Sequence, residues 1–147
     1  MTNNAPLRGA RSGLTLIELI VVMIVIGLLA GLVAPQILGR VSDAKVTSAR
    51  VQIELLGSAL ENYRLDNGLY PTTAQGLAAL RAKPAGAPEP RNWRGPYLRK
   101  AVPQDPWGRP YIYRSPGESD RSSFDLLTLG RDGLKGGEGE DSDFGSS

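Results

Sequence analysis

An unbroken apolar run from Leu14 to Val33 limits the structures that this chain can form. It is twenty residues long, and Glu18 carries its only charge. As a helix rising about 1.5 Å per residue, the run would span roughly the 30 Å hydrocarbon core of a bilayer. A cleavable secretory signal has a shorter apolar core followed by a small-residue cleavage site, whereas this run continues into more helix-like sequence. The run therefore predicts a retained membrane helix.

The segment before the run is short and basic. Residues 1–13 contain Arg8 and Arg11 and no acidic residue. Because positive charge tends to stay on the cytoplasmic side, we expect this end to remain inside and the rest to be exported. The predicted organisation is a leader at 1–13, a membrane segment at 14–34 and an exported polar domain at 35–147.

Glu18 is unusual in such a helix. A carboxylate there is costly unless it lies near the membrane interface, is protonated or meets a cation. From spacing alone, an interfacial Glu18 and a paired Glu18 both remain open. Cleavage between Gly13 and Leu14 would create a suitable cation, because the new α-amino group would lie next to this carboxylate, in its own chain or in a neighbour.

The segment Ser12–Leu19, SGLTLIEL, resembles the processing site of type IV pilins and of the pseudopilins of type II secretion systems. The resemblance implies that a membrane-embedded prepilin peptidase cuts after Gly13 on the cytoplasmic side and methylates the new N-terminus at Leu14. It also implies that Glu18 pairs with the terminal amine of an adjacent subunit during filament assembly. Leu14 stands where Phe is usual in this family, but it remains apolar.

Pro35 interrupts the helical pattern just after the apolar run. Proline removes a backbone hydrogen bond and usually bends a helix, and Gly27, Gly31 and Gly39 weaken the same region. We expect a kink or local melting here. A simple kink at the membrane exit is one interpretation, and the resemblance adds that the helix loosens at this proline when subunits pack into a filament.

From Ile37 to about Asp66 the sequence predicts an amphipathic helix that continues the apolar run, giving one helix of about fifty residues. Asn67 or Gly68 suits the left-handed conformation that ends a helix. The predicted buried stripe, with spacings of three and four, is Val46, Ala49, Ile53, Leu56, Leu60 and Tyr63.

A second, short helix is predicted at about 74–81, with Thr72 or Thr73 as its N-cap. Leu77 and Leu80 would pack on the long helix.

The rest of the domain is predicted to be loops and short strands. Residues 82–96 contain four prolines and indicate a loop, which Trp93 and Trp107 anchor. Residues 111–114 and 124–129 are predicted to form an antiparallel hairpin across the long helix, and the length allows two or three short strands. The predicted fold class is α+β, a long N-terminal helix packed on one small domain.

The amino-acid composition of the chain limits the classes of function that it can have. The chain has no Cys and no His, so disulfides, thiolate metal sites and the usual general base are absent, and catalysis is disfavoured. The formal charge of +2 equals the charge of Arg8 and Arg11, so the chain from Leu14 onward is formally neutral in its side chains. The composition therefore gives no argument for nucleic-acid binding.

Motifs along the whole chain narrow the resemblance to the major pseudopilin family of type II secretion, general secretion pathway protein G. They are Tyr70-Pro71-Thr72-Thr73, Gln75-Gly76-Leu77, Gly95-Pro96-Tyr97-Leu98, Asp105-Pro106-Trp107-Gly108, Pro110-Tyr111, Leu129-Gly130 and Asp132-Gly133. The resemblance implies a pilin-like fold and a subunit of a periplasmic pseudopilus that pushes folded proteins through the outer membrane.

The same resemblance implies a set of partners. These are further copies of the chain, minor pseudopilins, the prepilin peptidase, an inner-membrane assembly platform with a separate cytoplasmic ATPase, and the outer-membrane secretin complex. The implied location is the inner membrane, crossed once, with the C-terminal domain in the periplasm.

The tail from Asp132 onward holds five acidic residues against Lys135. Its composition is typical of a solvated, disordered tail, but its oxygen ligands and glycines also suit a hard cation, calcium rather than zinc. It is not an EF-hand, because Leu134 and Gly136 stand where that loop needs acids.

The resemblance favours the calcium interpretation, since major pseudopilins bind one structural calcium in this loop. It implies side-chain ligands from Asp132, Asp141 and Asp143 and main-chain carbonyl ligands from Leu129 and Arg131. Calcium would then fold the last loop onto the hairpin and support assembly.

Two alternative functions remain at this point. A surface type IV pilin is structurally close, although such pilins often carry a C-terminal disulfide that this chain cannot form. A membrane-anchored periplasmic calcium-binding module that never polymerises is the other. Replacing Glu18 separates this module from the filament subunits, because a mere anchor should tolerate Gln or Val there whereas a filament subunit should fail to assemble.

Overall fold

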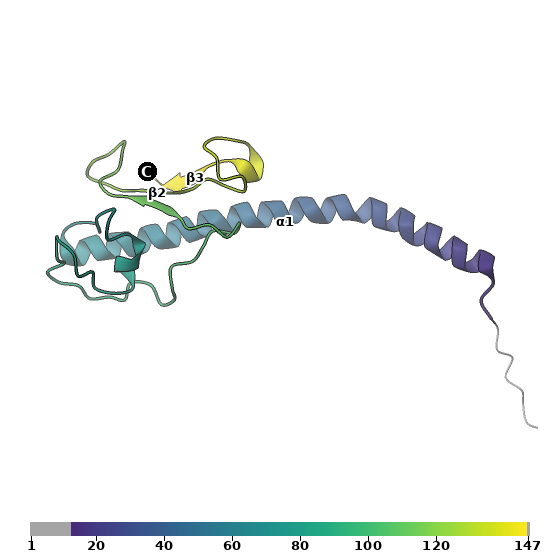
Figure 1. Cartoon of the computed structure of the whole chain (residues 1–147), viewed down its shortest axis with the longest axis horizontal. Coiled ribbons are helices and arrows are strands. Elements are labelled where there is room, and N and C mark those ends of the chain that lie inside the picture. Colours follow the sequence, from purple (N-terminus) through teal and green to yellow (C-terminus); the bar gives the residue numbers. More distant parts are fainter. Residues whose placement is uncertain (1–12, 147) are drawn as a thin grey trace, which may run out of the picture. The chain divides into compact units, whose positions relative to one another are not determined.

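A computed structural model describes the backbone of residues 13–146, and the side chains of that range apart from 33–38. The elements in chain order are α1 (Leu16–Asn67), the 3₁₀ helix η1 (Leu77–Leu80), β1 (Ile112–Arg114), β2 (Asp125–Thr128), the 3₁₀ helix η2 (Gly139–Asp141) and β3 (Phe144–Ser146) (Figure 1). The chain divides into two compact units, the first ending at Gly39 and the second beginning at Arg40. The predicted α+β class is confirmed.

Helix α1 has 52 residues, close to the predicted length. It ends where the sequence indicated: Gly68 adopts φ 81° and its N–H donates to the carbonyl of Arg64 at 2.7 Å. This left-handed residue closes the helix. The backbone is helical through Pro35, so the expected local melting does not occur in this structure.

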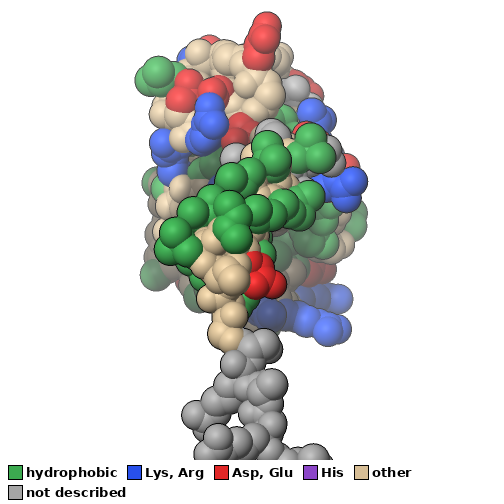
Figure 2. Space-filling model, turned by 90° about the vertical axis from the view of Figure 1, so that its right-hand side faces the viewer, with side chains coloured by type: hydrophobic (Ala, Val, Ile, Leu, Met, Phe, Trp, Pro, Cys, Tyr) green, Lys and Arg blue, Asp and Glu red, His purple; other side chains and the backbone are tan. Residues whose placement is uncertain are grey.

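The first unit exposes nearly all of its apolar side chains. From Leu14 to Leu32 the large hydrophobic residues are between 44% and 79% exposed, and Figure 2 shows hydrophobic side chains covering this helix. In the part of the chain that the structure describes, no helix combines the length and the hydropathy needed to cross a membrane.

The second unit has a core of its own, built on one face of α1. Five of the six residues of the predicted stripe are buried, and Val46 is half-buried against the same cluster. Spacings of three and four place these side chains on one side of the helix. The residues that pack against them from the rest of the unit include Tyr70, Leu77, Leu80, Tyr111, Tyr113, Phe124, Leu126 and Phe144.

The sheet has three antiparallel strands in the order β1-β2-β3. In β1 and β2, Tyr113 pairs with Leu126, and both side chains are buried. The predicted hairpin is therefore confirmed. The third strand comes from the acidic tail, where Phe144 pairs with Thr128 and is only 5% exposed. The tail is ordered because this aromatic ring reaches the core.

The second helix is shorter than predicted. A turn over residues 73–76 precedes η1, which is a 3₁₀ helix of four residues. Thr72 caps the turn: its hydroxyl accepts from the Gln75 N–H at 3.2 Å while the Gln75 side chain accepts from the Thr72 N–H at 3.0 Å. This reciprocal pair is a capping box. Leu77 and Leu80 are buried, as predicted.

Candidate functional site

The bond between Gly13 and Leu14 lies just outside the start of α1. Both residues are exposed, and apart from the chain neighbours no atom of the described residues lies within 4 Å of a Cβ built on Gly13. The Thr15 hydroxyl accepts a hydrogen bond from the Glu18 N–H at 3.3 Å, so Thr15 is the N-cap of the helix. A peptide bond in such an extended, open segment is accessible to a peptidase.

The role of Thr15 was missed from the sequence, although a signal was present. Thr15 and Glu18 have the threonine-x-x-glutamate spacing of a capping box. The cap places Glu18 in the first helical turn, where a carboxylate interacts favourably with the helix dipole. Among the described side chains, Glu18 forms no salt bridge.

Two predicted positions fall partly or wholly outside the described part of the chain. The leader residues 1–12, with Arg8 and Arg11, are outside it, and only the backbone of Pro35 is described.

A second candidate region, the C-terminal loop, spans residues 129–143 between β2 and β3. Its base is fixed by Asp105, a carboxylate only 4% exposed. One oxygen, Oδ1, accepts from the N–H groups of Trp107 at 3.0 Å and Arg109 at 2.8 Å, and Oδ2 accepts from the Thr128 hydroxyl. Arg109 Nη1 in turn donates to the carbonyl of Gly130 at 2.6 Å. Asp105 thus ties the turn at 105–109 to the start of the loop.

Close backbone packing shapes the loop itself. The Arg131 N–H donates to the carbonyl of Glu140 at 2.7 Å. Gly130 and Gly137 adopt φ 64° and 91°, and a Cβ on either would collide with the backbone of residues 140–142. Only glycine fits these two places.

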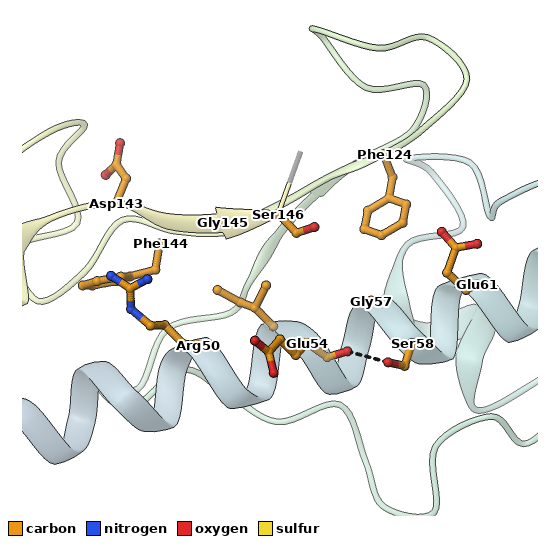
Figure 3. Close-up of a pocket in the computed structure, with 11 residues that line it drawn as sticks. Arg50, Glu54, Gly57, Ser58, Glu61, Phe124, Asp143, Phe144, Gly145 and Ser146 are labelled. Carbon is orange, nitrogen blue, oxygen red and sulfur yellow. Dashed lines mark hydrogen bonds between the residues drawn. The ribbon is translucent and has the colours of Figure 1, made fainter.

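The far end of the loop is anchored on α1. A groove of about 730 Å³ lies between α1 and β3, and Figure 3 shows Phe144 pointing toward Arg50 on the helix while Asp143 points away. The Arg50 guanidinium lies 5.2 Å from the ring centroid of Phe144, which also stacks on Trp107 at 6.0 Å. Alternation along the strand therefore turns Asp143 toward the loop.

The three predicted carboxylates have separate partners. Asp132 accepts from the Leu134 N–H at 3.0 Å and Asp143 from the Gly136 N–H at 3.1 Å. Asp141 pairs with the side chain of Arg131, with Nε to Oδ1 at 2.9 Å and Nη2 to Oδ2 at 2.8 Å. This guanidinium holds the pKa of Asp141 below its usual range, and the carboxylate raises the pKa of Arg131.

The loop has suitable donor chemistry for calcium but not a ready arrangement. Its donors are carboxylate and carbonyl oxygens, the ligands that calcium prefers. The carbonyl of Leu129 already accepts from the Gly133 N–H at 3.2 Å. Within the described residues, no three acidic, His or Cys side chains converge as a metal site would require. The residues Asp132, Asp141, Asp143, Leu129 and Arg131 lie in one loop without sharing one centre.

The long helix with its exposed apolar start and the small sheet define a pilin-like protein. Two family models match the chain: "Prokaryotic N-terminal methylation motif" over residues 8–34 and "Type II secretion system (T2SS), protein G" over residues 36–147. The chain belongs to the type II secretion system protein G family.

Individual relatives agree with this assignment. The chain is 48% identical over 139 residues to the type II secretion system core protein G of Pseudomonas aeruginosa PAO1, covering 95% of this chain and 96% of the relative. It is 47% identical over 137 residues to the protein of that name from Vibrio cholerae, covering 92% and 91%. The crystal structure of the major pseudopilin from the type 2 secretion system of enterohaemorrhagic Escherichia coli matches with a TM-score of 0.61 and 41% identity, covering 74% of this chain and 90% of that one.

These findings favour a pseudopilin over the surface pilin and the calcium-binding module. The family is a structural one and not an enzyme family. Membership implies a membrane-anchored periplasmic protein that assembles into a pseudopilus with other secretion components.

Proposed function

We propose that this chain is the major structural subunit of a type II secretion pseudopilus, which polymerises in the periplasm and drives folded proteins across the outer membrane. The observation that carries the proposal is the first part of α1, in which the described large apolar side chains up to Leu32 are exposed. A surface of this kind is stable only in lipid or against other apolar helices. Catalysis has no part in the proposed function.

In the proposed sequence of events, the apolar helix lies first in lipid and then against the apolar helices of other subunits. Residues 14–34 first cross the inner membrane once, with the second unit in the periplasm. A prepilin peptidase cuts after Gly13 and methylates Leu14, and Glu18 then pairs with the terminal amine of a neighbouring copy. In the filament these side chains would again be shielded from water, and relative to exposure in water their burial contributes roughly 1.5–3 kcal/mol for each large side chain.

The proposed partners are further copies of this chain, minor pseudopilins, the peptidase, the inner-membrane assembly platform and the outer-membrane secretin. Pro35 lies in the segment where the helix would loosen during packing.

The experiment that tests this proposal compares Glu18→Gln with wild type in cells containing the other secretion components. We expect normal cleavage and methylation by mass spectrometry, because the peptide bond at Gly13 is unchanged, but loss of sedimentable filaments. Glu89→Gln is the matched control, since Glu89 is an exposed carboxylate in the second unit with only a 3.7 Å contact to Lys83. Normal filaments from the Glu18 variant, or an intact chain starting at Met1 in wild type, would overturn the proposal.

We also propose that the C-terminal loop binds one calcium ion, with ligands from Asp132, Asp141 and Asp143 and from the carbonyls of Leu129 and Arg131. The support is the all-oxygen donor set and the glycines that let the backbone turn. Binding requires Asp141 to leave its present partner. A calcium-dependent rise in the Tm of the processed chain is the expected result, and no rise would refute this part.

A further inference from the structure

The strongest unexplained contact in the C-terminal loop is the side-chain pair between Arg131 and Asp141. Two guanidinium nitrogens face the two carboxylate oxygens at 2.9 and 2.8 Å. This parallel arrangement is the bidentate geometry in which arginine binds carboxylates best. The third nitrogen, Nη1, lies 3.4 Å from Glu140 Oε2. One guanidinium therefore covers two adjacent acids.

Asp132 and Asp143, the other two proposed carboxylate ligands, are held differently from Asp141. Asp132 and Asp143 each accept a backbone N–H, from Leu134 and Gly136, and such bonds leave carboxylate lone pairs free. Asp141 alone has both oxygens taken by a cation.

We propose that Arg131 is an internal cation that competes with calcium for Asp141. This inference depends on the calcium site proposed above and concerns what controls its affinity. The guanidinium and a calcium ion cannot both take the two oxygens of Asp141, so binding of the metal includes breaking this pair. A nearby positive charge also repels the incoming ion.

The pair also links the two sides of the loop. Glu140 and Asp141 are adjacent in sequence, and a positive charge between their carboxylates relieves their repulsion. The loop is thus held by Arg131 in one state and by calcium in the other. The main-chain carbonyl of residue 131 remains a possible ligand whatever side chain is attached there.

The test is calcium titration of the peptidase-processed full chain in detergent, by isothermal calorimetry with calcium chloride. We expect Arg131→Ala to bind calcium about 1.4- to fivefold more tightly than wild type, the range that double-mutant cycles give for an exposed ion pair. Arg131→Lys keeps the charge but loses the two-pronged geometry, so its affinity should be intermediate. Arg114→Ala is the matched control, because it removes an equally charged, exposed partner of Glu118 far along the chain, and its affinity should equal that of wild type.

A second readout separates competition from a simple loss of structure. In EGTA, Arg131→Ala should melt at a lower temperature than wild type, whereas in saturating calcium the gap should close. A variant that merely misfolds would be lower in both.

The outcomes are distinct. Equal calcium affinities for wild type and Arg131→Ala would overturn the competition while leaving the calcium site intact. If only Arg131→Ala bound calcium, competition would be supported and the calcium site of the natural chain refuted. If neither bound, both proposals would fail.

Discussion

The two parts of α1 belong to one continuous helix but place their apolar side chains in opposite environments. Before Leu32 the large hydrophobic residues are exposed on all sides, whereas after Arg40 a single stripe is buried against the chain's own sheet and loops. A stripe can be covered by one small domain, but an all-apolar helix needs neighbours around its whole circumference. The second part therefore buries its apolar side chains within the chain, whereas the first leaves an apolar surface that lipid or other chains can cover.

A matched pair of leucine truncations tests this difference between the two parts of α1 and gives the largest expected effect. Leu60→Ala in the second unit, where Leu60 is fully buried, should lower the free energy of unfolding by about 3 kcal/mol through lost burial and a cavity. Leu29→Ala, at a side chain 57% exposed, should change it by less than about 0.5 kcal/mol. Denaturant unfolding followed by tryptophan fluorescence measures this, because both tryptophans lie in the second unit. Equal effects would mean that the two parts of the helix fold as one.

The next largest effect is expected at Asp105. Replacing it by Ala leaves the Thr128 hydroxyl and two backbone N–H groups without their acceptor, which should cost about 2–3 kcal/mol of stability. Asp105→Asn keeps one acceptor oxygen and should cost less than half as much. Thermal unfolding of both variants checks this order, and equal losses would show that the charge of Asp105 matters here rather than its hydrogen bonds.

Two glycine substitutions in the C-terminal loop separate the cost of backbone strain from the cost of a steric collision. Gly136→Ala should cost about 1 kcal/mol, because φ is 92° but the space around it is open. Gly130→Ala should cost about 2 kcal/mol, since its Cβ also meets the carbonyls of Glu140 and Ser142. Similar Tm values for the two variants would show that the backbone of the loop yields to the added methyl group.

The last expected effect, a pH dependence from Tyr111, is absent at neutral pH. Burial raises the pKa of this phenol to about 12, above its value of 10 in an unfolded chain. Its ionisation therefore favours the unfolded chain, so the stability it contributes is complete below pH 10 and falls as the pH rises toward 12. Tyr111→Phe should show a shallower fall in Tm between pH 9 and 12. An unchanged slope would assign the effect to other groups.

The C-terminal loop was only partly predictable. Its acids and glycines indicated a turning, acidic segment, but composition cannot say which carboxylate meets which donor. The pair between Arg131 and Asp141 joins residues ten positions apart, and the contact between Asp105 and Thr128 spans 23 positions. No local pattern encodes either contact.

Short-range chemistry explains why other elements were predictable. The α1 stripe follows from a period of three and four, its end from Gly68, and the capped turn from Thr72. Strand β3 was not located, because three residues of Phe-Gly-Ser have no strand pattern of their own. They form a strand because they pair with the edge of β2 and because Phe144 packs against Trp107 and Arg50.

Residue order and local chemistry are enough to specify the long helix, its division into an all-apolar part and a one-sided part, the N-terminal methylation motif and the family. These depend on periodicity and on neighbouring residues, which a linear chain specifies directly. The tertiary structure alone decided the third strand, the anchoring of the C-terminal loop and the cation that meets Asp141. These depend on which distant groups come within hydrogen-bonding reach once the core has formed.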